Sequence, residues 1–186
     1  MKFITGSFKE LQPQLMTQVA KYRHKVFVEK LGWQLQCKDA LEYDQFDRED
    51  TMYVVVQDDR GNIVGTARLL PTSGPYLLGE VFPQLLHGLP APCSDDVWEL
   101  SRVAALDFNA KYTAPSKSTS SPIMVGLVKA ALACAAAQGA KELVSVSPVG
   151  VERLLYRAGF VVHRMGAPVI VDGKPIMACM IPVAQS

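Results

Sequence analysis

The sequence lacks the features that mark several classes of protein. Its 4 cysteines form no Cys-x-x-Cys pair and its histidines form no His-Glu-x-x-His motif, so we expect neither structural disulfides nor a metal site. Positive charge is not in excess either. The 19 Lys and Arg residues face 18 Asp and Glu residues, and this balance gives no reason to expect a nucleic-acid partner.

Long hydrophobic runs are also missing. The first residues contain no apolar core of a signal peptide, and the most apolar later stretch, 123–137, is interrupted by Lys129 and is too short to span a bilayer. We therefore expect a cytoplasmic protein without a membrane partner.

The composition that is present is typical of a globular protein. Of the 186 residues 49% are hydrophobic and 20% are charged, which is enough for a substantial core. The sequence contains no internal repeat and no low-complexity tract. We therefore expect residues 1–186 to form a single domain.

The order of predicted elements indicates an α/β fold. Helical spacing of apolar residues predicts a helix, or a broken pair of helices, over 11–31, with Gly32 as its end. Two runs rich in β-branched residues, 52–57 and 63–70, flank a turn that contains Asp and Gly. This pattern is typical of an antiparallel hairpin.

The second half of the sequence predicts a parallel crossover. A strand over 97–104 is followed by a polar segment and then by a helix over 122–138, which Ser121 is expected to cap. The remaining predicted elements are a strand over 142–147, a helix over 151–158, and strands over 160–162, 169–171 and 176–181. A strand, helix, strand unit normally makes a right-handed parallel crossover. The expected fold class is an α/β/α sandwich with a mixed, mainly antiparallel sheet.

The strand over 97–104 carries polar residues that an apolar core does not require. Glu99, Ser101 and Arg102 stand among Trp98, Leu100 and other apolar residues. Charged groups are costly to bury unless they are paired or used. Strict alternation places Glu99 and Ser101 on one face and Arg102 on the other, so a shared site would need a β-bulge near Ser101.

Several other segments carry polar and aromatic residues in a defined order. Each alone has a structural explanation: Arg23 on a solvated helix face, Trp33 as a core anchor, Asp44 and Asp47 as caps, Arg68 as an edge-strand charge. Together they form the following series of motifs: Tyr22-Arg23-x-x-Val26-Phe27, Gly32-Trp33, Asp44-x-x-Asp47, Gly65-Thr66-Ala67-Arg68-Leu69-Leu70, Phe82, Leu85-Leu86, Trp98-Glu99-Leu100-Ser101-Arg102 and Gly150-Val151-Glu152-Arg153. In this order the sequence resembles the acyl-homoserine-lactone synthases, the autoinducer synthases of bacterial quorum sensing.

The resemblance implies a reaction and a fold. The amine of S-adenosylmethionine attacks an acyl thioester, and its carboxylate then displaces methylthioadenosine to close a lactone. S-adenosylmethionine is thus a substrate, and no cofactor is expected. The implied fold is N-acyltransferase-like, with the 97–104 strand bulged and splayed from its parallel neighbour.

The resemblance also assigns site residues. The expected catalytic residues are Glu99 as general base, Ser101 as a helper and Arg102 as a pocket-forming cation. The residues expected to bind S-adenosylmethionine are Arg23, Phe27, Trp33, Asp44, Asp47, Arg68, Phe82, Arg102 and Val103. An alternative role for the charged residues is a buried ion network that only shapes the pocket.

One departure from the related acetyltransferases bears on the choice of acyl donor. Their glycine-rich loop, which holds the pyrophosphate of coenzyme A, has no counterpart here, because 107–122 contains no glycine. This favours acyl carrier protein over acyl-coenzyme A. Lys129, Arg153, Arg157 and Arg164 are candidates for docking an acidic carrier protein, or form an ordinary solvated surface.

The acyl pocket is expected along the strand over 142–147 and the helices beside it. Its candidate residues are Met124, Leu127, Ser145, Val146 and Ser147. Two other functions remain open: an N-acyltransferase that uses acyl-coenzyme A on another amine, and a non-catalytic module that binds S-adenosylmethionine or a carrier protein.

Overall fold

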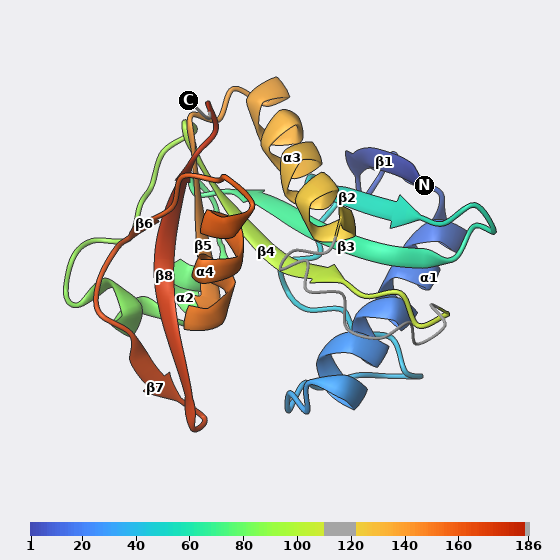
Figure 1. Cartoon of the computed structure of the whole chain (residues 1–186), viewed down its shortest axis with the longest axis horizontal. Helices are drawn as coiled ribbons and strands as arrows, with labels where there is room; N and C mark the ends of the chain where they lie inside the picture. The colour runs from blue at the N-terminus through green and yellow to red at the C-terminus, as the bar shows by residue number, and fades with distance from the viewer. Residues whose placement is uncertain (110–121, 185–186) are drawn as a thin grey trace.

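A mixed sheet forms the middle layer of the molecule (Figure 1). The computed structural model describes residues 1–109 and 122–184. The strands are β1 (Lys2–Ser7), β2 (Met52–Gln57), β3 (Ile63–Pro71), β4 (Val97–Ala105), β5 (Glu142–Pro148), β6 (His163–Arg164), β7 (Val169–Val171) and β8 (Lys174–Pro182). Their order is β1-β2-β3-β4-β5-β8-β6, with β7 also paired to β8. Among the strands of the described residues only β4 and β5 pair in parallel, which confirms the predicted mixed, mainly antiparallel sheet.

Helices cover both faces of the sheet. On one face α3 (Pro122–Ala137) and α4 (Val149–Arg157) pack over a core that includes Leu69, Leu127 and Leu155. On the other face lie α1 (Pro13–Arg23) and the π-helix η1 (His24–Lys30), followed along the sheet by α2 (Leu77–Glu80) and the 3-10 helix η2 (Pro83–Leu86). In the described part of the chain, no helix is long and apolar enough to cross a membrane.

Most predicted elements are confirmed, with shifts of a few residues at their ends. The helix predicted over 11–31 is α1 continued by η1, and Gly32 follows with a φ of 69°, a conformation that suits glycine. Ser121, the predicted cap of α3, lies outside the described residues.

The sequence does not predict the short helices α2 and η2, and the strand predictions contain one omission and one error. The prediction missed β1, a short strand of mixed polarity that pairs with β2 at the edge of the sheet. The segment 160–162, expected as a strand, forms none: Phe160 and Val162 are buried against the α3 side of the sheet, and strand pairing starts only at His163. The apolar run Phe160-Val161-Val162 arises from burial of an irregular segment.

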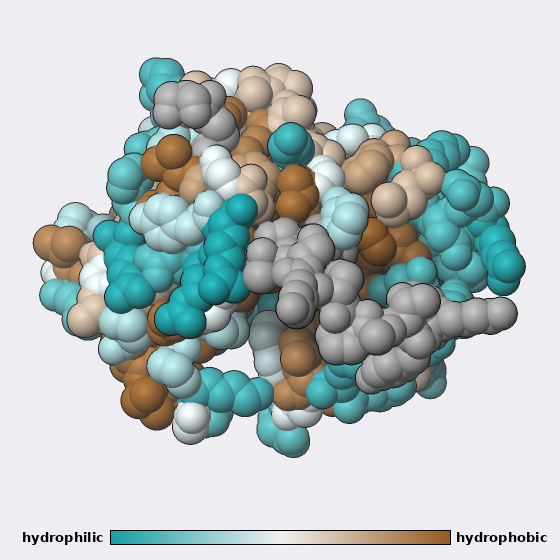
Figure 2. All heavy atoms as spheres, in the orientation of Figure 1, coloured by the Kyte–Doolittle hydropathy of each residue, from teal (hydrophilic) through white to brown (hydrophobic). Residues whose placement is uncertain are grey.

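The sheet opens between β4 and β5. Their ladder holds only three pairs and ends at Glu99 and Val144, although both strands continue (Figure 1). The surface is hollowed between the half of the molecule that carries β1 to β4 and the half that carries β5 to β8 (Figure 2). At the far end of the opening, Lys174 Nζ at the start of β8 donates a hydrogen bond to the Leu31 carbonyl oxygen after η1, at 3.2 Å. This opening confirms the expected splayed strand pair.

A β-bulge interrupts the pairing of β4 with β3. Thr66 pairs with Ala104 and Arg68 with Ser101, so Ala67 alone faces two residues of β4. One of these two, Arg102, has a φ of 51°. A bulged residue in this left-handed region turns the strand and redirects its side chains. The bulge predicted near Ser101 is therefore confirmed.

Candidate active site

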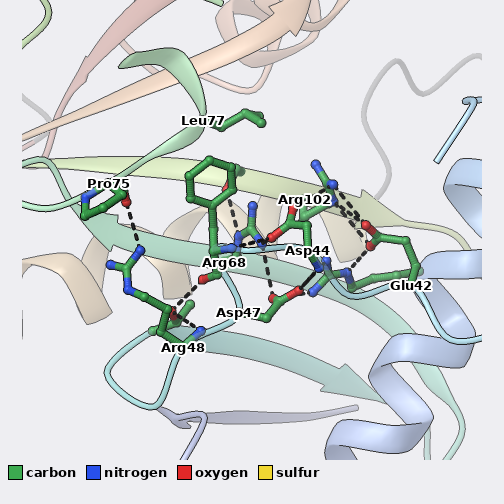
Figure 3. Close-up of polar contacts among 12 residues, drawn as sticks. Glu42, Asp44, Asp47, Arg48, Arg68, Pro75, Leu77 and Arg102 are labelled. Atoms are coloured by element: carbon green, nitrogen blue, oxygen red, sulfur yellow. Dashed lines mark hydrogen bonds and ion pairs between the residues drawn. The ribbon is translucent and has the colours of Figure 1, made fainter. Parts of the chain in front are cut away.

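Six charged side chains meet between α1 and the sheet, beside the opening of β4 and β5 (Figure 3). The cations are Arg23 at the end of α1, Arg68 in the middle of β3 and Arg102 at the bulge of β4. The anions Glu42, Asp44 and Asp47 come from the segment that leads into β2. The bulge brings Arg102 to the same face of the sheet as Ser101 and Arg68. The network is buried and its formal charges balance.

Asp47 is the most heavily paired of the anions. The guanidinium of Arg23 binds it with a fork, Nη1 to Oδ1 at 2.7 Å and Nη2 to Oδ2 at 3.0 Å. Arg68 Nη1 and the hydroxyl of Tyr53 also donate to Oδ1, at 3.1 Å and 2.5 Å. Burial alone would raise the pKa of Asp47, but these cations and hydrogen bonds hold it well below its usual range. Asp47 is therefore ionised in the folded protein.

Glu42 is a member of the network that sequence reasoning missed. Arg102 Nε and Nη2 donate to Glu42 Oε1 at 3.1 and 2.9 Å, and Arg23 Nε donates to Oε2 of the same carboxylate. Glu42 thus joins two arginines that come from different elements. The available signal was its position two residues before Asp44, flanked by Leu41 and Tyr43, in a segment already singled out for its carboxylates.

Arg68 keeps one donor free. Its Nη1 binds Asp44 Oδ1 at 2.5 Å and its Nε donates to Ser101 Oγ at 3.1 Å. Arg68 Nη2 is buried and has no hydrogen-bond partner among the described residues. A buried guanidinium nitrogen without a partner is costly.

An aromatic pair lies beside the network. The rings of Phe27 and Trp33 stack with their centroids 4.7 Å apart. Arg102 Cζ lies 5.7 Å from the first ring centroid and 5.9 Å from the second, within the range of cation–π attraction. Two predicted aromatic residues and one predicted cation are therefore brought together.

Glu99 is buried but makes no hydrogen bond to the arginines in the described structure. Its Oε1 accepts the backbone N–H of Leu78 at 2.7 Å, and its Oε2 accepts that of Leu77 at 3.0 Å. Burial raises the pKa of Glu99, and the two amides oppose this shift. The carboxylate therefore joins the end of the β4–β5 ladder to the start of α2.

Phe82 and Val103 lie away from the charged network. Phe82 is half-buried and packs with the apolar residues around α2 and η2. Val103, the second bulged residue, packs on the α3 face of the sheet, opposite to Arg102. The structure thus places both side chains among apolar residues.

The expected acyl-pocket residues fall on both faces of the sheet. Met124 and Leu127 of α3 pack on one face, and Val146 of β5 packs on the opposite face with the residues around α2. Ser145 Oγ donates to the Leu100 carbonyl oxygen at 2.8 Å, just beyond the last β4–β5 pair. Ser147, also buried, lies two residues further along β5.

Comparison with known proteins decides the family. Residues 7–186 match the family described as autoinducer synthase. The chain belongs to this family. It is 52% identical to the acyl-homoserine-lactone synthase of Acinetobacter nosocomialis, over 98% of the chain and 100% of that relative. The family match confirms the predicted enzyme class, an acyltransferase that makes the acyl-homoserine lactones of quorum sensing.

Solved structures of synthases share the whole fold. The crystal structure of TofI in a ternary complex with an inhibitor and MTA is 44% identical, with a TM-score of 0.84, over 100% of this chain and 94% of that one. BjaI, described as a CoA-dependent synthase and solved with SAM and isopentyl-CoA, is 27% identical, with a TM-score of 0.82, over 97% and 82% of the chains. An N-acetyltransferase of Lactobacillus plantarum, at 19% identity and a TM-score of 0.63, shares the fold. The N-acyltransferase-like architecture is confirmed.

Proposed function

We propose that this autoinducer synthase acylates the amine of S-adenosylmethionine from an acyl thioester on acyl carrier protein and then closes the lactone. The observation that carries the proposal is the buried network beside the β4–β5 opening, where Arg68 keeps Nη2 free. This donor suits the substrate carboxylate, and the Phe27–Trp33 pair suits its sulfonium. A non-catalytic module would not need a carboxylate such as Glu99 at the opening.

The first chemical step needs a base. The amine of S-adenosylmethionine is largely protonated at neutral pH and must lose a proton before it attacks the thioester carbon. Glu99 is the proposed base, directly or through a water. Each of its oxygens accepts one amide and so keeps lone-pair capacity, and its raised pKa makes it a stronger base than an exposed glutamate. The amine nitrogen forms the amide and the carrier thiol leaves.

The second step is an intramolecular displacement. The substrate carboxylate attacks the carbon next to the sulfonium, the carbon–sulfur bond breaks, and its electron pair leaves with neutral methylthioadenosine. S-adenosylmethionine is consumed, so it is a substrate and the proposal includes no cofactor. Ser101 Oγ accepts from Arg68 Nε, which leaves the hydroxyl proton available to a substrate oxygen.

Acyl carrier protein is the proposed donor partner, and the proposed location is the cytoplasm. Arg153 and Arg157 are exposed on α4, beside the half of the sheet that carries β5. Arg164 is less available than the sequence predicts, because a fork of hydrogen bonds holds it to Glu152. The absence of glycine from 107–122 supports a carrier arm without a coenzyme A pyrophosphate.

The acyl chain is proposed to enter the opening between β4 and β5. Met124 and Leu127 bound it on the α3 face, and Ser145 and Ser147 provide hydroxyls along β5. Val146 bounds the opposite face. Methionine side chains adapt their shape, so this region accepts different packing more readily than the ion network does.

The deciding experiment incubates the purified protein with S-adenosylmethionine and a panel of acyl thioesters, on acyl carrier protein and on coenzyme A. Mass spectrometry is expected to find lactone and methylthioadenosine in equal amounts, with carrier-protein thioesters preferred. No lactone from any thioester would overturn the proposal. Free thiol without methylthioadenosine would instead indicate acylation of another amine.

Carrier docking is tested separately by charge reversal. The double variant R153E/R157E is expected to raise KM for the acyl carrier protein thioester about tenfold or more and to leave KM for S-adenosylmethionine unchanged. The matched control K2E/K21E changes the same number of exposed charges on β1 and α1. Equal KM values for both variants would remove α4 as the docking surface.

A further inference from the structure

We infer that the backbone amides of Leu77 and Leu78 are positioning groups of the active site: they orient the Glu99 carboxylate and tie it, through α2, to Phe82. The inference rests on the proposed function, because it concerns how the proposed base is held. It adds a segment, 76–82, in which only Phe82 had been expected to take part.

The position of Glu99 is the first observation that supports the inference. Glu99 is the last β4 residue paired with β5, so its side chain stands where the sheet opens. Both of its oxygens accept main-chain N–H groups, at 2.7 and 3.0 Å, and the side chain is fully buried. Two donors at short distance fix the plane of the carboxylate and leave one lone-pair direction on each oxygen for a proton.

The surroundings of Glu99 show why these amides matter. The two arginines form their ion pairs with other carboxylates: Arg68 binds Asp44 and Asp47, and Arg102 binds Glu42 and Asp44. They act on Glu99 only through their charge, and the charge of Glu99 in turn raises the pKa of the Tyr76 hydroxyl on the α2 side. The paired residue of β5 is the apolar Val144. Within the described structure, the only hydrogen bonds to this carboxylate come from α2.

Leu77 connects Glu99 to Phe82 through its own peptide groups. Its N–H donates to Glu99, while its carbonyl oxygen accepts the N–H groups of Val81 at 2.8 Å and Phe82 at 3.3 Å. The hydroxyl of Tyr76 anchors the start of α2 by donating to the Pro92 carbonyl oxygen at 2.6 Å. Movement of Glu99 would therefore move the segment that carries Phe82.

Leu77→Pro is the substitution that removes one donor with little change in the backbone. Proline suits this position because Leu77 is the first residue of α2, where its N–H has no helical partner. Proline also requires an extended preceding residue, and Tyr76 already has φ −151° and ψ 162°. The matched control Leu77→Ala keeps the N–H and removes the side chain.

The readout is the pH dependence of kcat/KM. Loss of a donor to the ionised carboxylate raises the pKa of Glu99, so the acid limb of the profile is expected to move to higher pH in L77P. A shift of about one unit lowers kcat/KM about tenfold on the acid side and much less on the plateau. L77A is expected to keep the acid limb of the wild type. Identical limbs in L77P and L77A would overturn the inference.

Hydrogen exchange provides a test that does not depend on the folding of L77P. In the wild-type protein the amides of Leu77 and Leu78 are expected to be protected, and in Glu99→Ala the segment 76–82 is expected to exchange about tenfold faster or more. Unchanged protection would overturn the inference. Exchange is measured without substrates, so a wild-type protein that makes no lactone refutes the proposed function and leaves this test intact.

Discussion

The two sides of the β4–β5 opening are built from different chemistry. On the α1 side, six charged groups hold one another in fixed positions by hydrogen bonds and ion pairs. On the α3 side, the opening is lined by apolar packing and a few hydroxyls. A charged, invariant substrate requires donors at set positions, whereas an acyl chain requires only volume. The difference supports the proposed division, in which the first side binds S-adenosylmethionine and the second binds the acyl chain.

The charged side contributes position more than stability. Taking six charges out of water costs several kcal/mol for each ion before pairing offsets it. A core of leucines would fill the same space at lower cost. The network therefore supports the proposed role of this side, which is to hold charged groups in fixed positions for the substrate.

Asp47→Asn is expected to produce the largest effect, because it breaks the most heavily paired member of the network. Arg23 and Arg68 would lose a shared anion while they remain buried. The free energy of unfolding is expected to fall by about 3–5 kcal/mol, and kcat/KM for S-adenosylmethionine to fall more than a hundredfold. Denaturant titration and steady-state kinetics measure the two effects. A fall of less than about 1 kcal/mol in the free energy of unfolding would contradict the structural role of Asp47 in the network.

The pH dependence of stability checks the same residue. The pKa of Asp47 is lower in the folded than in the unfolded protein, so its contribution to stability is complete above the unfolded pKa of about 4 and is lost as the pH falls through the folded pKa. The difference between wild type and D47N is therefore expected to narrow below pH of about 4. A constant difference down to low pH would assign the loss to packing instead.

Leu127→Ala tests the apolar side. Leu127 is fully buried against the α3 face, and its truncation is expected to cost about 3 kcal/mol of stability. The cavity is expected to shift the preferred thioester to a longer chain, with KM for S-adenosylmethionine unchanged. Competition between thioesters of two lengths measures the shift. An equal loss of activity with thioesters of every chain length would mean that Leu127 only supports the core.

Ser145→Ala tests the contact across the opening. It leaves the Leu100 carbonyl oxygen without its Ser145 donor, which is expected to cost about 1–2 kcal/mol. Ser145→Thr keeps a hydroxyl and serves as the control. Thermal unfolding of both variants is the measurement, and equal destabilisation of the two would point to packing at β5.

Glu152→Gln is expected to have the smallest effect. Its fork with Arg164 resembles that of Asp47 with Arg23, but the side chain of Arg164 is 45% exposed. Exposed pairs contribute about 0–1 kcal/mol, so stability and KM for S-adenosylmethionine are expected to remain near the wild-type values. A loss as large as that of D47N would show that burial does not separate the two pairs.

The sequence predicted what depends on local pattern. The hairpin, the crossover and the longer helices α1, α3 and α4 follow from periodicity and turn residues, whereas the short helices α2 and η2 were not predicted. The bulge followed from the conflict between Glu99 and Arg102 on one strand. The segment 160–162 was misread because burial in a loop and pairing in a strand leave the same apolar pattern. The partners of Glu42, Arg164 and Glu99 depend on which loops meet in space, and no local pattern contains that information.

The left-handed backbone of Arg102 restricts how this position can change. Glycine or asparagine would relax the backbone at φ 51°, but either would leave Glu42 and Asp44 facing each other without the cation between them. Lysine would keep the charge but lose the flat guanidinium that lies near Phe27 and Trp33. Each single substitution thus relieves the backbone strain or keeps the charge, but none keeps both the charge and the aromatic contact. A change of Arg102 alone therefore disturbs the backbone, the ion network or the aromatic contact, and Arg23 and Arg68 are the cations that would remain beside Glu42 and Asp44.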